Sequence, residues 1–493
     1  MLFSAIADLS KRKEAELVAV PFWEKPTPAT PLKTLATVVK PPILAKDFTG
    51  KEGEISLLYP KGGKEKRLVL IGLGKESELS VDGLRRVYST LVKFCLKKKL
   101  SKINLLLPNI VALRTITLEE CLQGICEGVL LTNYQWNRKT TAKEKSHFLK
   151  HVTLVGTLPQ TLGMVRPIEE VAEAVYLTRD LINENADVVT PHYLGEVALG
   201  LSKKFPAIKS TIFDKKRIEK EKMGLLLAVS QGAATEPRFI ISRYEGNPRS
   251  KDHTLLVGKG VTFDSGGINL KPTGHIETMR EDMSGAATVL GTLAAAAATN
   301  LKVNLTVVVP ATENAVDAKS YKPGDIFTSY SGKTVEVVNT DAEGRLILAD
   351  ALSYAIKHLK PTRVIDLATL TGSMVVALGN GISGFFSNDV KLAKQLLDAG
   401  NSTSELLWQM PLHKPYKEGL KSDAADLKNC ASGRAAGSIT AALFLEEFVG
   451  KVAWAHIDIA GTAFIDKEFH YWPKSAVGFG VRLLVDFLKK ISR

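Results

Sequence analysis

Three acid-rich segments in the second half of the chain contain residue types that could bind metal ions. They lie at predicted strand or helix ends, and none contains histidine. The segments are 257–267, 279–287 and 339–346, and their acidic residues are Asp264, Asp282, Asp341 and Glu343. Four carboxylates gathered in one place would raise one another's pKa values unless cations balanced their charge. Two divalent ions would supply that balance, and oxygen ligands suit Zn²⁺, Mn²⁺ or Mg²⁺.

Each of these acids also fits an ordinary structural role when it is considered alone. An aspartate near a glycine-rich strand end, such as Asp264, commonly caps a helix or forms a turn. Asp282 precedes an alanine-rich helix and could interact with its N-terminal dipole. Asp341 and Glu343 could belong to a simple helix entry. The residue types alone therefore leave both interpretations open.

The surrounding pattern predicts the elements that would bring these segments together. From residue 254 onward, strand-like apolar runs alternate with helical patterns, which indicates a mostly parallel or mixed sheet with helices on both faces. The predicted strands are 254–257, 303–309, 334–338, 363–367 and 452–459, and the helices are 286–298 and 346–359. In open α/β sheets, sites form at the carboxyl ends of strands, so the acid-rich segments can converge there.

The chain of 493 residues is too long for one ordinary core and predicts an α/β protein of two domains. A smaller N-terminal α/β domain is expected over 1–160, with strands at 16–20, 67–71 and 102–107 and a helix at 83–95. Helical spacing of apolar residues over 168–183 predicts a linking helix within 161–190. The larger domain, 191–493, would hold a mixed central sheet flanked by helices.

The net charge of +13 is concentrated in the first third of the chain, where residues 1–160 hold 26 Lys and Arg against 15 Asp and Glu. The basic runs 61–67 and 97–99 supply much of this charge, and they could attract nucleic acid or simply form a solvated face. Four cysteines in so long a chain form no disulfide framework, which favours a reduced compartment. No signal peptide is expected at the N-terminus, and the apolar helix 286–298 is too short to span a bilayer. We therefore expect a cytoplasmic protein without a membrane segment.

Several other motifs fail on inspection. Gly72 and Gly74 follow a strand, but the third glycine of a dinucleotide-binding motif would fall at Ser77. Gly332 resembles the end of a P-loop, yet Phe327 stands where its first glycine is required. There is also no GxSxG elbow, so a serine hydrolase of the α/β type is not supported.

The acid-rich segments, taken together, closely resemble the leucyl aminopeptidase (cytosol aminopeptidase) family. Asn339-Thr-Asp-Ala-Glu-Gly-Arg-Leu346 is similar to that family's signature octapeptide. Other blocks match in order and spacing: 258–267, 270–272, 282–287, 368–372 and 439–448. The resemblance is strong from about residue 175 onward and weak over 1–160.

This resemblance implies a metal-dependent leucyl aminopeptidase that releases N-terminal Leu and other apolar residues from peptides. Asp264 and Glu343 would bridge two divalent ions, Mn²⁺ or Zn²⁺ and possibly Mg²⁺. Lys259 and Asp282 would complete the tighter site, and Asp341 the more exchangeable one. Lys259 would have to be neutral to act as a ligand, and two adjacent cations would depress its pKa enough.

The resemblance also assigns residues outside the metal ligands. Lys271 would stay charged and stabilise the developing oxyanion. Arg345 would hold a bicarbonate ion that acts as general base. Residues implied to line the pocket for the first side chain are Met279, Thr369, Leu370 and Gly372, with Ala460 and Ala463 as weaker candidates. The metals would bind the free α-amine of the substrate and activate a water, so an internal residue would not be cleaved.

Assembly and secondary roles are further expectations. The family resemblance implies a homohexamer with active sites facing an internal cavity. Some bacterial members of this family also bind DNA, and the basic first third is compatible with such an additional architectural role. A degenerate enzyme kept as a scaffold is the third alternative, which the unsubstituted ligand positions disfavour.

Overall fold

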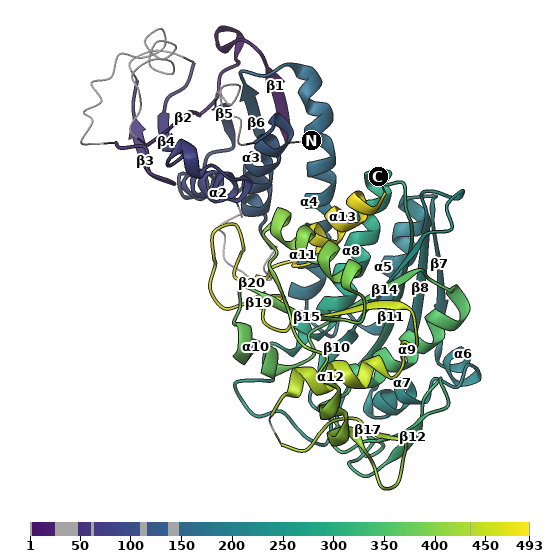
Figure 1. The fold of residues 1–493 in the computed structure, drawn as a ribbon. Helices are drawn as coiled ribbons and strands as arrows, with labels where there is room; N and C mark the ends of the chain where they lie inside the picture. Colours follow the sequence, from purple (N-terminus) through teal and green to yellow (C-terminus); the bar gives the residue numbers. More distant parts are fainter. Residues whose placement is uncertain are drawn as a thin grey trace. The chain divides into compact units, whose positions relative to one another are not determined.

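The computed structural model describes residues 2–24, 48–60, 64–108, 116–136, 147–433 and 435–492, so residues 61–63 of the first basic run lie outside it. The chain forms two compact units, each of which is described by itself (Figure 1). The first unit comprises Met1–Glu173 together with Lys467–Pro473, and the second comprises Ala174–Asp466 and Lys474–Arg493. The sequence pattern gave no indication that 467–473 joins the first unit.

The first unit is built on a six-stranded sheet in the order β1-β6-β5-β2-β4-β3. Every neighbouring pair is parallel except β3 with β4. The strands are β1 Phe3–Ile6, β2 Leu17–Phe22, β3 Ile55–Leu58, β4 Leu68–Gly72, β5 Lys102–Leu106 and β6 His151–Val155. The three strands predicted from short apolar runs correspond to β2, β4 and β5, all of which are largely buried.

Two helices of the first unit pack closely on one another. They are α2 (Val81–Lys97), capped by Ser80, and α3 (Leu118–Asn133), which begins with a capping box. Gly128 of α3 permits the approach, because a Cβ there would lie 2.6 Å from the carbonyl oxygen of Arg85 in α2. Helix α2 matches the helix predicted at 83–95 and extends it by two residues at each end.

The second unit contains a nine-stranded mixed sheet with the path β16-β15-β18-β14-β9-β11-β8-β7, and β10 pairs with β11 beside that path. The strands are β7 Ile208–Phe213, β8 Arg238–Glu245, β9 His253–Gly258, β10 Gly260–Asp264, β11 Asn304–Asn314, β14 Arg363–Ala368, β15 Ser383–Ser387, β16 Leu407–Gln409 and β18 Ala453–Asp458. Strands β9, β10, β11, β14 and β18 run parallel, so their carboxyl ends share one edge.

Helices cover both faces of this sheet, as expected for parallel strands. Leu255 and Val257 of β9 belong to the same hydrophobic core as residues of α9 (Gly344–Leu359). Leu256, which points to the opposite face, is also fully buried. Helix α8 (Ser284–Ala298) packs on β9, β11 and β14. The prediction of an α/β protein with a mixed central sheet flanked by helices is confirmed.

The remaining elements complete the two units. Helix α4 (Leu162–Asn183) starts earlier than its apolar spacing predicted, because it continues through Pro167. The other α-helices are α5 Pro191–Lys204, α6 Lys215–Lys220, α7 Gly224–Val229, α10 Gly372–Leu378, α11 Val390–Thr403, α12 Gly437–Glu446 and α13 Val481–Ile491. Small sheets are formed by β12 Ile326–Thr328, β13 Thr334–Glu336 and β17 Leu427–Lys428, and by β19 Phe464–Ile465 with β20 Ser475–Ala476. Among the described residues, no helix has the length and apolar character needed to cross a bilayer.

Candidate functional site

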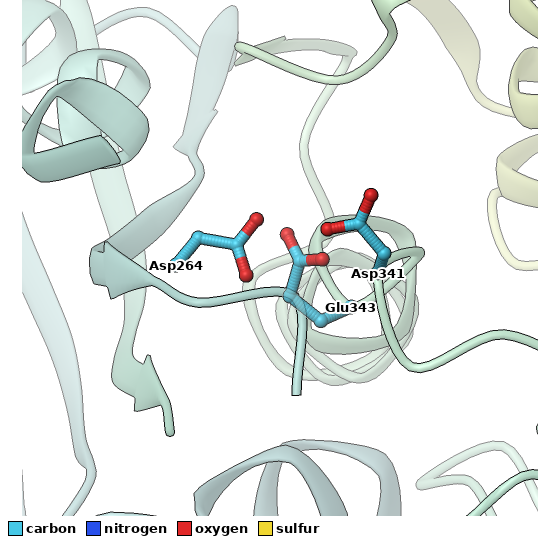
Figure 2. Close-up of side chains that lie close together, drawn as sticks. All are labelled: Asp264, Asp341 and Glu343. Atoms are coloured by element: carbon cyan, nitrogen blue, oxygen red, sulfur yellow. The ribbon is translucent and has the colours of Figure 1, made fainter. Parts of the chain in front are cut away.

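The acid-rich segments meet at the carboxyl edge of the nine-stranded sheet. Lys259 lies between β9 and β10, and Asp264 ends β10. Asp282 lies in a short 3₁₀ helix, η5 (Met279–Met283), which runs into α8. Asp341 and Glu343 occupy the turn before α9. Figure 2 shows that the carboxylates of Asp264, Asp341 and Glu343 gather in one place, and one oxygen from each lies within 4.8 Å of the others.

Two lysines connect the acids into one network. Lys259 Nζ lies 2.7 Å from Asp282 Oδ1 and 2.8 Å from Glu343 Oε1. Lys271 Nζ lies 2.9 Å from Asp264 Oδ2 and 2.6 Å from Asp341 Oδ1. The structure therefore brings together all five predicted metal ligands and one predicted catalytic residue, Lys271. Asp341 is the exposed member of the set of ligands, and the other four are buried.

Neither Asp282 nor Glu343 caps the helix that follows it through a side-chain hydrogen bond. Helix α8 takes Met283 as its N-cap, and Glu343 stands at the N-cap of α9 without a side-chain capping bond. Asp264 does form a local turn, because its Oδ1 accepts the N–H of Gly266 at 2.8 Å. Two buried acids without a capping bond, close to a third, are costly unless a positive charge compensates them.

Burial and mutual repulsion raise the pKa values of most of these acids. Burial and the neighbouring Glu343 raise the pKa of Asp264 to about 6. Burial likewise raises the pKa of Asp282 well above its usual value, and that of Asp341. Glu343 differs: burial would raise its pKa, but the charges of Lys259 and Lys271 outweigh burial and lower it. Glu343 is thus the acid held most firmly in its ionised form.

The same carboxylates keep the lysines protonated. Burial would lower the pKa of Lys259, but Asp282, Glu343 and Asp264 outweigh it and raise that pKa. The pKa of Lys271 rises for the same reason, with Asp264 as the strongest contributor against burial. A neutral Lys259 able to act as a ligand therefore requires cations that take over its role as counter-charge.

The donor set fits divalent cations. Asp282 Oδ2 and Glu343 Oε2 are buried in the described structure without a hydrogen-bond partner, although the opposite oxygen of each carboxylate is paired. Unpaired buried carboxylate oxygens next to an amine and two further acids form a hard, mainly oxygen ligand set. The predicted ligands are therefore chemically suited to the metals, whose identity the donor set leaves open.

Asn314, which the sequence reasoning missed, orients part of this cluster. It is the last residue of β11 and fully buried. Its Nδ2 donates to Asp264 Oδ1 at 2.8 Å and to the carbonyl oxygen of Thr340 at 3.0 Å. It thereby links the end of β10 to the turn that carries Asp341. Its position at a parallel strand's carboxyl end was the signal that could have revealed it.

Glycines allow the loops to approach the cluster closely. Gly266 has φ +87°, and a Cβ there would lie 2.8 Å from Asp341 Oδ1. A Cβ at Gly344 would lie 2.5 Å from Lys259 Cε. Neither contact is tolerable for another residue without a shift, so these glycines are part of how the cluster is assembled.

Arg345 lies in the first turn of α9 with a buried guanidinium. Its Nη1 donates to the carbonyl oxygen of Asn429 at 3.0 Å, and its Nε has no partner among the described residues. Burial lowers its pKa from the usual value. A free N–H on a buried guanidinium suits a small anion, which is compatible with the predicted bicarbonate role.

Among the residues predicted to line a side-chain pocket, Thr369 contacts the cluster directly. Thr369 follows β14; its Oγ1 donates to Asp282 Oδ1 at 2.8 Å, and its carbonyl oxygen accepts Lys259 Nζ at 2.9 Å. Leu370 comes next and is half-buried, whereas Gly372 is exposed at the start of α10. Met279 shares η5 with Asp282.

The weaker pocket candidates follow a neighbouring strand. Ala460 and Ala463 come just after β18, and Ala463 is buried. Every one of the predicted pocket residues therefore lies on a segment adjacent in sequence to the carboxyl edge or to a cluster acid.

Comparison with known proteins matches both parts of the chain to one protein family. The pattern of the "Cytosol aminopeptidase family, catalytic domain" matches residues 176–485, and that of the same family's N-terminal domain matches residues 20–143. A "Probable cytosol aminopeptidase" of Protochlamydia amoebophila is 50% identical over 500 residues, covering 100% of this chain and 99% of its own length. A protein with the same description from Chlamydia abortus is 49% identical over 499 residues, covering 99% of each chain.

Solved structures agree over nearly the whole chain. The "Bottromycin maturation enzyme BotP" has a TM-score of 0.85 and 28% identity, covering 97% of this chain and 99% of its own. The same enzyme "in complex with Mn" has a TM-score of 0.86 and 29% identity, covering 97% of this chain and 100% of its own.

Proposed function

The chain belongs to the cytosol aminopeptidase family and is thus a peptide hydrolase of the exopeptidase type, and we propose that it uses two divalent cations to release N-terminal residues, with a preference for Leu and other large apolar ones. The observation that carries this proposal is the network of four acids, three of them buried, and two lysines at the carboxyl edge of the sheet. The Mn²⁺ named with BotP lends support from a relative of 29% identity.

The residues that would hold the cations are Lys259, Asp264, Asp282, Asp341 and Glu343. Asp264 and Glu343 would be shared between the two ions, as the family resemblance implies. When bound, divalent cations supply Lewis acidity that polarises a peptide carbonyl and lowers the pKa of water. Asn314 and Thr369 would hold Asp264 and Asp282 in the required orientation, through the 2.8 Å bonds that each makes.

Lys271 is suited to stabilise negative charge on the scissile carbonyl oxygen. Its side chain is 15% exposed, whereas that of Lys259 is 4% exposed, so Lys271 is the lysine that a substrate can reach. Its charge is maintained by Asp264 and Asp341. An ammonium placed at a developing oxyanion in a partly dry site lowers the barrier to its formation. Arg345 would bind bicarbonate through its free N–H and so place a base beside the reacting water.

The bound cations would explain why a free N-terminus is selected. The neutral α-amine of a peptide end can ligate a divalent cation, and an internal residue offers no such group. The half-buried Leu370 supplies an apolar wall beside Thr369, which suits an apolar first side chain.

The test is hydrolysis of leucine p-nitroanilide by metal-stripped protein, with and without added Mn²⁺ or Zn²⁺. We expect the metals to restore activity in the wild type, and Asp341→Ala to lower it by at least about 100-fold, with bound metal measured in parallel. Asp187→Ala, which changes an exposed aspartate, is the control and should retain full activity. Failure of the wild type on leucine and other amino-acid substrates would reject the proposal and favour a scaffold role.

Assembly and location are separate proposals that rest on family membership. We propose a homohexamer in the cytoplasm. Analytical ultracentrifugation would show a particle six times the mass of the 53.6 kDa chain. A monomer or dimer at micromolar concentration would contradict this assembly. The DNA-binding role predicted from the basic first third stays a prediction, to be tested by salt-dependent gel shifts.

A further inference from the structure

Asp458 is a buried acid just behind the site that has no role in the proposed chemistry. It is the last residue of β18 and only 1% exposed. Its Oδ1 accepts the backbone N–H of Leu370 at 3.1 Å and that of Ala460 at 3.2 Å. Its Oδ2 accepts the hydroxyl of Thr371 at 2.7 Å. One carboxylate therefore holds together the loops that follow two neighbouring strands, β14 and β18.

The bond to Leu370 extends to the acid cluster through one peptide group. The N–H that Asp458 accepts belongs to the peptide whose carbonyl oxygen, that of Thr369, accepts Lys259 Nζ at 2.9 Å. Because a peptide group is planar, fixing the direction of the N–H also fixes the direction of the carbonyl. Asp458 thus orients the wall of the site directly beside Lys259.

The partners of Asp458 distinguish it from an ordinary buried ion pair. Within the described part of the chain, no lysine, arginine or histidine lies within ion-pair distance of it, and its three hydrogen bonds come from neutral donors. The charges of Arg345 and His456 act on Asp458 only from beyond direct contact. A buried carboxylate without a contacting cation costs more desolvation than an amide or an apolar residue at the same place. All three donors lie on loops that border the site.

Asp366 provides a contrast within the same sheet. It is a fully buried acid on β14, two residues before the strand end, and it bonds Trp454 Nε1 and His456 Nδ1, each at 2.6 Å. Both of its partners lie inside β18 and neither belongs to a loop of the site. Asp366 ties two strands together, whereas Asp458 ties two loops together.

We propose that Asp458 is a positioning residue that sets the shape of the pocket for the first side chain of the peptide. It does so by holding the loop Thr369–Gly372 and the turn at Ala460 at a fixed separation. Thr371 takes part, because its hydroxyl also bonds Ser438 Oγ at 2.7 Å and so anchors the loop to α12. The inference rests on the proposed aminopeptidase function and adds the determinant of its side-chain selectivity.

The test compares kcat and KM for leucine and alanine p-nitroanilides in metal-loaded protein. Asp458→Ala should reduce the preference for leucine, expressed as the ratio of kcat/KM values, by about tenfold, mainly by raising KM for the leucine substrate. Asp458→Asn should restore most of that preference, since its Oδ1 can accept both N–H groups while its Nδ2 donates to Thr371. Asp366→Ala is the matched control and should change the ratio by less than about twofold, even though it destabilises the fold.

A second pair of variants keeps the test decisive if Asp458→Ala does not fold. Thr371→Val removes the hydroxyl at nearly constant volume and should lower the preference for leucine, whereas Thr371→Ser should preserve it. If Asp458→Ala and Thr371→Val both turn over substrate with an unchanged preference for leucine, the role of Asp458 is overturned. The proposed aminopeptidase function would survive that result. No turnover by the wild type on either substrate would instead overturn the proposed function, and the inference with it.

Discussion

Asn314 joins two parts of the acid cluster through a single side-chain amide. Both of its N–H groups are used, one by Asp264 and one by Thr340. Losing it would leave Asp264 Oδ1 with the N–H of Gly266 as its remaining hydrogen-bond donor and so loosen the orientation of the carboxylate. Mutation of a group that orients a metal ligand typically lowers metal affinity or activity by about 10–100-fold.

We therefore predict that Asn314→Ala weakens Mn²⁺ binding by about 10–100-fold, measured by isothermal titration of the metal-stripped protein. Asn304 is a matched control because it begins the same strand and its Nδ2 donates to Asn247 and Ser250 at the opposite end. Asn304→Ala should lower stability and leave the metal affinity unchanged. Equal affinities in the wild type and Asn314→Ala would contradict the orienting role.

Helix α9 carries the cluster at its first turn and a second buried acid, Asp350, further along. Asp350 Oδ2 accepts the N–H groups of Leu225 and Leu226 at 2.8 and 3.0 Å, and its Oδ1 accepts that of Tyr330 at 2.7 Å. It satisfies the start of α7, where Met223 provides no side-chain cap. Two elements and a loop are thus held by one carboxylate, which fixes α9 in place.

Burial raises the pKa of Asp350 to about 7 in spite of these three donors. An unfolded aspartate has a pKa of about 3.9, so the folded protein binds this proton more tightly. The stabilisation that protonated Asp350 gives to the folded state is fully present below about pH 4, and it is lost as the pH rises through about 7. We predict that the unfolding free energy of Asp350→Asn lacks this decline between about pH 4 and 7 in urea titrations. Parallel pH profiles for the wild type and the variant would contradict the prediction.

The first unit contains a segment that comes from almost the end of the chain. Tyr471 is 5% exposed, and its hydroxyl donates to Asp82 Oδ1 in the first turn of α2 at 2.6 Å. Lys93 of the same helix lies 3.3 Å from Glu468. The segment Lys467–Pro473 therefore helps to stabilise a unit built mostly from the first third of the sequence.

Tyr471→Phe should destabilise this unit by about 1 kcal/mol, because it leaves one acceptor site on Asp82 unfilled. Hydrogen exchange of the α2 amides would report the loss as faster local opening. Tyr59→Phe is the control, since Tyr59 belongs to the same unit and is 67% exposed. If the α2 amides exchange at the same rate in Tyr471→Phe as in the wild type, the segment Lys467–Pro473 does not stabilise the first unit through this bond.

The sequence by itself determined the α/β class, the main strands and the segments that carry the acid cluster. It could do so because apolar periodicity and short motifs such as 339–346 are local properties. The predicted and observed bounds agree to within one residue at each end in β4, β5, β9, β14 and β18.

Only the tertiary structure decided which neighbours surround each acid. Asn314 and Asp458 carry no local signal beyond their places at strand ends, and the segment Lys467–Pro473 carries none, since an asparagine, an aspartate or an aromatic loop has many ordinary uses in a sequence. Their partners lie 50, 88 and 389 residues away, as for Asn314 with Asp264, Asp458 with Leu370 and Tyr471 with Asp82. Contacts at such separations depend on how the sheet orders its strands, and that order follows from packing the whole chain rather than from any one segment.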